Sequence, residues 1–369
     1  MKVRKLVLNG FRNYEWETAE FSDSTNVISG RNAQGKTNLL EAIFLLSCGK
    51  SYRTRQDREL VGFDYSEAEI LAEVFSHDRD QTVRIRLVPG QAKKITVNGV
   101  KKTASELSET VNTVLFSPED LNLIKDGAAI RRRMMDQAIS QIRPKYGALL
   151  TEYNRLYEHK TRILKDWREK PSLLDTLDSF SDALCRVSAQ LIRYRASYLD
   201  RLQAAVIPIH ADFSGNGEEL SLNYRTVSTV RDPFAPVKEI YYDICDHQER
   251  HRQAELDSAL CLTGAHKDDV EILINGRSAR SFASQGQTRT AALSVKLAER
   301  EIILQETGEY PVLLLDDVLS ELDGKRQEFV LNRIGGGQTL ITCCEDTGIS
   351  GRTGGKIFLV EGGKILSCT

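Results

Sequence analysis

The alternation of apolar and polar residues predicts a strand-rich N-terminal third. Short runs in which aliphatic or β-branched residues alternate with polar ones are typical of strands with one buried face. Such runs occupy residues 2–11, 16–21, 25–29, 67–75, 81–88 and 93–102. The last run contains Asn98-Gly99, a dipeptide that favours a tight turn between antiparallel strands. We therefore expect a β-rich region up to about residue 117.

The period changes to that of helices in the middle of the chain. Apolar residues three and four positions apart predict amphipathic helices over residues 128–142, 146–170, 173–209 and 238–261. Further on, expected helices at 286–306 and 324–334 alternate with apolar strands at 269–276, 311–317 and 338–343, and a hairpin follows at 355–368. We predict an α/β domain with a mixed sheet, formed by residues 1–117 and 263–369 and interrupted by a largely helical insert at 118–262.

The composition is that of an ordinary globular protein. With 369 residues, 41% of them hydrophobic and 28% charged, the chain is long enough for two or three domains. Its formal charge of −2 does not by itself require a nucleic-acid partner. Seven cysteines without a C-x-x-C pair favour a reducing compartment. Because no apolar run is long enough for a signal peptide or a membrane span, we expect a cytoplasmic protein without a membrane partner.

A phosphate-binding loop follows the expected strand at 25–29. Residues 30–37 fit the pattern G-x-x-x-x-G-K-[ST], and an apolar helix pattern follows them. The glycines let the backbone wrap around a phosphate, and the helix N-terminus adds positive potential. We expect Lys36 to reach the β- and γ-phosphates of ATP and Thr37 to ligate Mg²⁺. The residues expected to contact the nucleotide are Gly30, Arg31, Asn32, Ala33, Gln34, Gly35, Lys36 and Thr37.

Two aspartates stand at the end of a buried strand. Residues 312–315 are all aliphatic, and Asp316 and Asp317 follow them. Because ligands of α/β sheets bind at the carboxyl ends of strands, we expect Asp316 to hold the Mg²⁺ of bound ATP and Asp317 to orient the attacking water. The predicted catalytic set is therefore Lys36, Asp316 and Asp317. Without the phosphate loop, the Asp pair would be explained equally well as a helix cap.

A second anion site is expected where the helix at 286–306 begins. Ser284, Gly286 and Gln287 combine a hydroxyl with the exposed backbone N–H groups of a helix start. A plain serine cap is the alternative interpretation. Along the chain, the order is phosphate loop, long insert, Ser-x-Gly-Gln, apolar strand with Asp-Asp, and then Ser-Glu-Leu-Asp at 320–323.

This order of motifs resembles that of ABC-type ATPase heads, with their signature, Walker B motif and D-loop. Within that superfamily the chain is similar to the RecF family of SMC-like ATPases. The similarity spans residues 8–323, is loose in the helical middle, and is carried by "GRNAQGKTNLLEAIFLLSCGKSYRTRQDRELVGF", "GAHKDDVEILING", "FASQGQTRTAALSVKLAE" and "LLLDDVLSELD". Two positions depart from the family pattern. Lys267 stands where the family often has Arg, and residues 342–344 lack a switch histidine.

The resemblance implies an ABC-type P-loop ATPase head with an antiparallel β-subdomain that forms a homodimer on ATP and binds double-stranded DNA or junctions at gaps. Ser284, Gly286 and Gln287 would then contact the γ-phosphate of ATP bound by the partner subunit. Together with RecO and RecR, such a recombination mediator promotes RecA loading at single-stranded gaps, in DNA repair, replication restart and the SOS response. Whether ATP is hydrolysed stays open; a weak DNA-stimulated ATPase would act as a timing switch.

Two other classes remain as alternatives. The first is an ABC subunit that powers a membrane transporter, for which the 248 residues between Lys36 and Ser284 are a long separation. The second is a structural SMC protein with a long coiled coil. The insert is too short to form one, since a helix rises only about 1.5 Å per residue.

Charge is segregated along the chain. Residues 131–170 carry 11 Lys/Arg and 5 Asp/Glu, whereas residues 301–330 carry 2 and 8. The run at 131–133 and the cluster of Arg53, Arg55 and Arg58 are candidates for contacts with DNA phosphates. A solvated helix face, or arginines paired with carboxylates, is the alternative.

Overall fold

The computed structural model describes residues 1–344, 351 and 354–368. The chain divides into two compact units, the first formed by Met1–Asn122 with Ala292–Thr369 and the second by Leu123–Ala291. Helix α7 (Gln285–Thr307) begins in the second unit and ends in the first. Among the described residues, none of the helices is long and apolar enough to cross a membrane.

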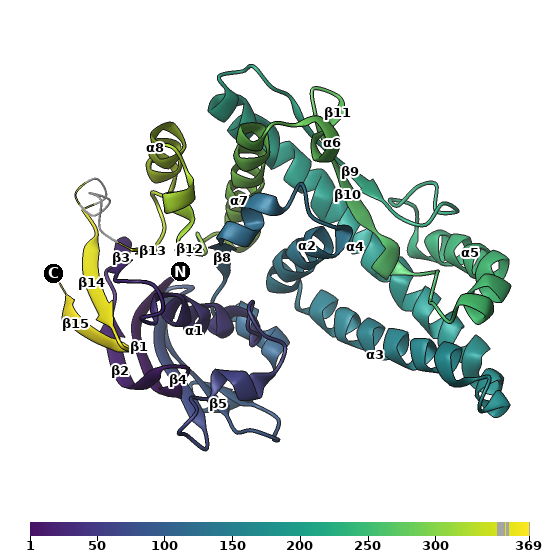
Figure 1. Ribbon diagram of the computed structural model, residues 1–369, viewed down its shortest axis with the longest axis horizontal. Coiled ribbons are helices and arrows are strands. Elements are labelled where there is room, and N and C mark those ends of the chain that lie inside the picture. The colour runs from purple at the N-terminus through teal and green to yellow at the C-terminus, as the bar shows by residue number, and fades with distance from the viewer. Residues whose placement is uncertain (345–350, 352–353, 369) are drawn as a thin grey trace. The chain divides into compact units, whose positions relative to one another are not determined.

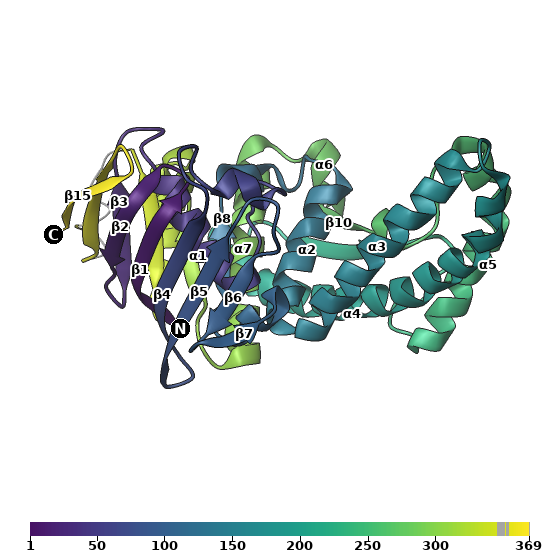
Figure 2. The same ribbon diagram turned by 90° about the horizontal axis from the view of Figure 1, so that it is seen from below.

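The first unit contains a six-stranded antiparallel sheet in the order β2-β1-β4-β5-β6-β7. One face, which includes Leu8, Ile70 and Ile85, joins the core, because these apolar residues alternate with polar ones. Figure 2 shows β1, β4, β5 and β6 side by side. The strands are β1 (Lys2–Phe11), β2 (Tyr14–Glu20), β4 (Ala68–Ser76), β5 (Arg79–Leu87), β6 (Lys94–Val97) and β7 (Val100–Lys102).

The second sheet of this unit is mixed, in the order β15-β14-β3-β13-β12-β8 (Figure 1). The pairs from β14 to β8 are all parallel, and only β15 pairs antiparallel. The parallel strands β8, β12 and β13 are buried along their whole length, as in VLLL at 312–315, which is expected for a sheet covered on both faces. The strands are β3 (Thr25–Ser29), β8 (Thr113–Phe116), β12 (Val312–Leu315), β13 (Thr339–Cys343), β14 (Lys356–Glu361) and β15 (Lys364–Cys368).

Helix α1 (Lys36–Cys48) shares one core with residues of both six-stranded sheets. It is buried nearly all round, which suits a helix enclosed between two layers. It ends at Gly49, whose φ of 63° gives the left-handed cap typical of helix C-termini. This unit also contains η1 (Asp57–Leu60), η2 (Ala104–Glu109), η3 (Pro118–Asn122), η6 (Val318–Glu321) and α8 (Gly324–Arg333).

The second unit is built around the long helix α4 (Leu174–Ser214), which packs against three other long helices and a small sheet. The sheet has the order β11-β10-β9. The other elements are α2 (Ala128–Ile142), α3 (Pro144–Asp166), η4 (Pro171–Leu173), β9 (Leu220–Arg225), α5 (Val237–Ser258), η5 (Ala265–Lys267), β10 (Asp269–Ile274), β11 (Arg277–Ser278) and α6 (Ala279–Phe282).

The second unit ends later than the boundary at 262/263 predicted for the insert. Residues 263–291 belong to it because β10 pairs along its whole length with β9, from Asp269 opposite Arg225 to Ile274 opposite Leu220. The partner strand β9 lies more than 40 residues upstream, so sequence periodicity alone did not reveal this pairing.

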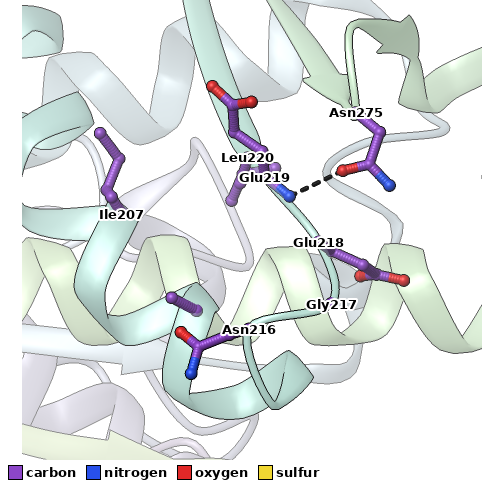
Figure 3. A pocket seen from close by; sticks show the side chains of 8 residues that line it. Ile207, Asn216, Gly217, Glu218, Glu219, Leu220 and Asn275 are labelled. Atoms are coloured by element: carbon purple, nitrogen blue, oxygen red, sulfur yellow. Dashed lines mark hydrogen bonds between the residues drawn. The ribbon is translucent and has the colours of Figure 1, made fainter.

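Figure 3 shows a hollow in the second unit where α4 leads into β9. Two hydrogen bonds join Asn275 to Glu219. The Glu219 N–H donates to Asn275 Oδ1 at 2.8 Å, and the Asn275 N–H donates to the Glu219 carbonyl at 2.9 Å. The hollow is lined by Ile207, Ala211, Asn216, Gly217, Glu218, Glu219, Leu220 and Asn275, none of which is a predicted site residue.

Candidate nucleotide-binding site

The residues of the first unit that are predicted to bind ATP meet at the carboxyl ends of the inner strands of the mixed sheet. The strands β3, β13 and β12 are parallel neighbours, so their carboxyl ends lie side by side. The phosphate loop follows β3, Thr342 lies near the end of β13, and Asp316 follows β12. The topology thus brings the loop and the carboxylate together across almost 280 residues of sequence.

The loop requires glycine at both ends. Gly30 has φ 153° and Gly35 has φ 121°, in the region that L side chains rarely adopt. A Cβ on Gly30 would lie 2.3 Å from the Val360 carbonyl oxygen, and one on Gly35 would lie 3.0 Å from the Tyr14 hydroxyl. Gly35 also caps α1, so the free N–H groups of the first helical turn face the loop with positive potential.

Lys36 lies under the loop, with only 3% of its surface exposed. Its ammonium donates to the carbonyls of Gly30 at 2.6 Å and Arg31 at 3.1 Å, and lies 3.5 Å from Asn32 Oδ1. A lysine ammonium has three donors and is a strong point charge for phosphate. Lys36 therefore holds the first half of the loop and is a cation available to a phosphate chain.

Asp316 is the acceptor for three hydroxyl groups. Its Oδ1 accepts hydrogen bonds from Thr37 and Thr342, each at 2.9 Å, and its Oδ2 accepts one from Tyr52 at 3.0 Å. The residue is 5% exposed, so these bonds fix the orientation of a buried carboxylate. Tyr52 and Thr342 were not predicted as site residues. Thr342 could have been found from its place near the end of a parallel strand, whereas Tyr52 carries no local signal.

Asp317 has one carboxylate oxygen, Oδ1, that is buried and lacks a hydrogen-bond partner among the described residues. Its backbone is left-handed, with φ 51°, and its N–H donates to Thr342 Oγ1 at 2.8 Å. Burial raises the pKa of the Asp317 carboxyl above its ordinary value; Lys36 opposes this and Asp316 adds to it. A strained residue with an unpartnered and more basic carboxylate is typical of a functional site.

The outer side of the phosphate loop is bonded to the C-terminal hairpin. Gln34 Oε1 accepts the Gly362 N–H at 2.7 Å, and the Gln34 carbonyl accepts the Gly363 N–H at 2.9 Å and the Asn13 side chain, also at 2.9 Å. The Gln34 side chain is therefore directed to the turn between β14 and β15. If Gln34 contacts a nucleotide as predicted, its backbone must make the contact.

Ser284, Gly286 and Gln287 lie at the start of α7, as the sequence indicated. The Gln287 N–H donates to Ser284 Oγ at 3.2 Å, and the Ser284 N–H donates to Gln287 Oε1 at 2.8 Å. This reciprocal pair is a capping box. Ser284 caps the helix and is also exposed. The two interpretations of the sequence, a helix cap and an anion site, are therefore compatible.

Some of the arginines considered for DNA contacts are paired within the protein. Arg131 is 3% exposed and donates to both carboxylate oxygens of Asp269, at 2.7 and 3.0 Å. In the first unit, Arg53 donates to Asn38 at 2.6 Å and to the buried carboxylate of Glu41 at 3.3 Å. For Arg131 the structure supports the alternative, an arginine paired inside the fold, whereas Arg53 is paired with Glu41 but stays exposed.

The chemistry of the site fits a magnesium nucleotide. A glycine-framed loop at a helix N-terminus, a lysine ammonium, a threonine hydroxyl and an adjacent buried carboxylate are the groups that bind phosphates and Mg²⁺ in P-loop proteins. When bound, the metal would neutralise phosphate charge. The orphaned Oδ1 of Asp317 is a further group available to the nucleotide or to a water.

The phosphate loop on a parallel sheet, with an antiparallel sheet across its helix, defines an SMC-like ABC-type ATPase head. The family model for the RecF/RecN/SMC N-terminal domain matches residues 2–350. The Smc head domain of Pyrococcus furiosus has the same fold, with a TM-score of 0.54 and 18% identity over 97% of this chain and 93% of that chain. The predicted fold class is confirmed.

Full-length similarity then defines the family. The DNA replication and repair protein RecF of Clostridium botulinum (strain ATCC 19397 / Type A) is 39% identical over 99% of both chains. A solved structure of the recombination mediator protein RecF–ATPrS in the RecFOR pathway has a TM-score of 0.92 and 34% identity, and covers 99% of this chain and 98% of that chain. The chain belongs to the RecF family of DNA replication and repair proteins, as its motifs indicated.

Proposed function

We propose that the protein is an ATP-dependent DNA-binding recombination mediator. The observation that carries the ATP part is the convergence of Thr37 and Thr342 on the buried Asp316 beside the phosphate loop. Thr37 and Asp316 would hold Mg²⁺, Lys36 would contact the phosphates, and Asp317 would orient a water. Hydrolysis would be weak and DNA-stimulated, and would time the release of DNA rather than alter it chemically.

The partners follow from family membership. The RecFOR pathway named for a solved relative supports RecO and RecR as partners, with RecA loading at single-stranded gaps as the outcome. The protein would act in the cytoplasm during DNA repair, replication restart and SOS induction. Its DNA would be double-stranded, or a junction of double and single strands at a gap.

The active form would be a homodimer that encloses two ATP molecules. Ser284, Gly286 and Gln287 at the start of α7 would contact the γ-phosphate of ATP bound to the partner subunit. The domain assignment accompanies this proposal: residues 1–117 and 263–369 carry the motifs of the ATPase head, and residues 118–262 form a lever-arm insert whose compact unit extends to Ala291.

The test is solution mass, measured by light scattering with and without ATP–Mg²⁺ and with gapped duplex DNA. We expect ATP to double the mass and DNA to stabilise the dimer. Lys36→Ala should abolish both the binding of nucleotide and the doubling. A wild-type mass that ignores ATP, with no DNA bound at low salt, would contradict the proposal.

Substitutions of Ser284 separate its two roles. Ser284→Ala removes both the cap and the hydroxyl, whereas Ser284→Asp keeps a good cap but adds a negative charge. If Ser284 contacts a phosphate in the partner, both variants bind ATP as monomers and neither dimerises. If Ser284→Asp dimerised although Ser284→Ala did not, Ser284 would act only as a helix cap.

A further inference from the structure

The antiparallel sheet of the first unit has one face outside the core. Leu6, Ile70, Ile85 and Ile95 occupy the buried face, so the residues between them along each strand occupy the other. The strands β5, β6 and β7 form one end of this sheet (Figure 2). The outer face of these three strands is called here the β5–β7 face.

Strand register brings four basic residues together on the β5–β7 face. Arg84 pairs with Thr96, which pairs with Lys101, and Arg86 pairs with Lys94. Directly paired residues of antiparallel strands project to the same side of the sheet with Cβ atoms about 5 Å apart. The four basic side chains are all exposed, and are Arg84, Arg86, Lys94 and Lys101.

The charge of this segment is strongly positive and only partly compensated. Residues 79–102 carry seven Lys/Arg and a single acidic residue, Asp80. Arg84 lies 3.7 Å from Glu69, a loose ion pair, and Arg86 bonds Glu67. Within the described residues, neither Lys94 nor Lys101 has an ion-pair partner. Exposed ion pairs of this kind contribute little free energy, so they hold the two arginines weakly.

Protection of a sheet edge does not account for this charge. Lysines on edge strands discourage pairing between molecules, which explains Lys101 on the edge strand β7. Arg84 and Arg86 lie on β5, an interior strand whose backbone is paired on both sides. The β5–β7 face is therefore better explained by a ligand than by protection of the edge.

The side chains indicate the chemistry of that ligand. The outward positions of β5–β7 are Asp80, Thr82, Arg84, Arg86, Lys94, Thr96 and Lys101, with no aromatic residue among them. The one acidic residue, Asp80, lies near the start of β5 and is paired with Arg4. Without aromatic residues, the face cannot stack single-stranded bases or form the apolar centre of a protein interface. Guanidinium, ammonium and hydroxyl groups on a flat surface suit a phosphate backbone.

We infer that the β5–β7 face binds the phosphate backbone of duplex DNA independently of sequence. This inference rests on the proposed DNA-binding function and identifies the surface that would contact the DNA. The stretch at 131–170 carries a similar excess of charge, but its Arg131 is buried against Asp269 and its Lys160 against Glu255. On the β5–β7 face the charges remain available.

The test compares two variants with the same change in charge. The first replaces all four basic residues of the face by glutamine: Arg84→Gln, Arg86→Gln, Lys94→Gln and Lys101→Gln. The control replaces four exposed basic residues of the helical stretch: Arg155→Gln, Arg162→Gln, Lys165→Gln and Lys170→Gln. Binding of a blunt duplex in the presence of ATP is measured by fluorescence anisotropy from low to moderate salt.

Each lost phosphate contact lowers the slope of log affinity against log salt by about 0.9, so the face variant should lose about 3 to 4 in slope while the control keeps the wild-type slope. Both variants should keep ATP binding. Equal losses in the two variants, or loss in the control alone, would overturn the assignment, as would a face variant that keeps the wild-type slope on the duplex. Failure of the wild-type protein to bind any DNA would instead contradict the proposed function.

Discussion

Replacing Tyr52 by Phe removes one hydroxyl and tests whether the site is organised around Asp316. The hydroxyl donates to Asp316 Oδ2 at 3.0 Å, and burial together with the charge of Asp316 raises the pKa of Tyr52 far above its ordinary value. Tyr52 therefore stays protonated, and hence a donor, at neutral pH. The ring meets Phe44 edge-on at 5.3 Å, a contact that Phe retains.

The magnitude follows from the kind of bond that is lost. A hydrogen bond to a charged acceptor contributes about 1.5–3 kcal/mol. Loss of a group that orients a metal-binding carboxylate typically lowers metal affinity about 10–100-fold, which corresponds to about 1.4–2.7 kcal/mol. The two threonine bonds to Oδ1 remain, so the carboxylate stays in place with one oxygen less constrained. We expect the affinity for Mg²⁺ to fall about 10–100-fold, so that ATP binding needs a correspondingly higher Mg²⁺ concentration.

The assay is titration of a fluorescent ATP analogue at increasing Mg²⁺ and again in EDTA. Tyr14→Phe is the matched control, because it removes a buried tyrosine hydroxyl that donates to the Gly35 carbonyl at 3.0 Å and does not contact Asp316. The control should weaken binding equally with and without Mg²⁺. If Tyr52→Phe behaves in the same way, or leaves the Mg²⁺ dependence unchanged, Tyr52 does not act through Asp316.

Three further outcomes are expected. Gln34→Ala removes the bond to the Gly362 N–H and should lower ATP affinity about threefold to tenfold, with or without Mg²⁺, in the same titration, since a neutral hydrogen bond contributes about 0.5–1.5 kcal/mol. Arg195→Met leaves the buried carboxylate of Asp268 without its cation and should lower the free energy of unfolding in urea by about 3–5 kcal/mol. Burial lowers the pKa of His266 from 6.5 to about 4, so the unfolded chain binds more protons in that range and stability falls as pH drops through it. Urea unfolding at pH 7 and pH 5 should show this loss in the wild type and a smaller one in His266→Gln.

The local parts of the fold and site follow from sequence because neighbouring residues determine them. The pattern at 30–37 needs a strand before it and a helix after it, and both are visible in apolar periodicity. The turn at Asn98-Gly99, with φ values of 50° and 79°, depends on two residues alone. Tyr52 and the hairpin turn at Gly362 reach the site only through tertiary contacts, Gly362 from 328 residues away. The pairing of β10 with β9 is non-local in the same way.

Charge shows the same division between local and distant information. A run such as Arg131–Arg133 indicates a basic surface from its composition, yet the environment of Arg131 is set by Asp269, 138 residues further on. In a strand, by contrast, the period of two decides which side chains share a face, and Val83 and Ile85 alternate with Arg84 and Arg86 in sequence. Basic residues that alternate with buried aliphatic ones must project away from the core, whatever lies opposite them. Alternating charge in a strand is therefore a stronger sign of an accessible surface than a denser run of charge on a helix. On the β5–β7 face, the basic residues that this rule places outside the core are all exposed in the structure.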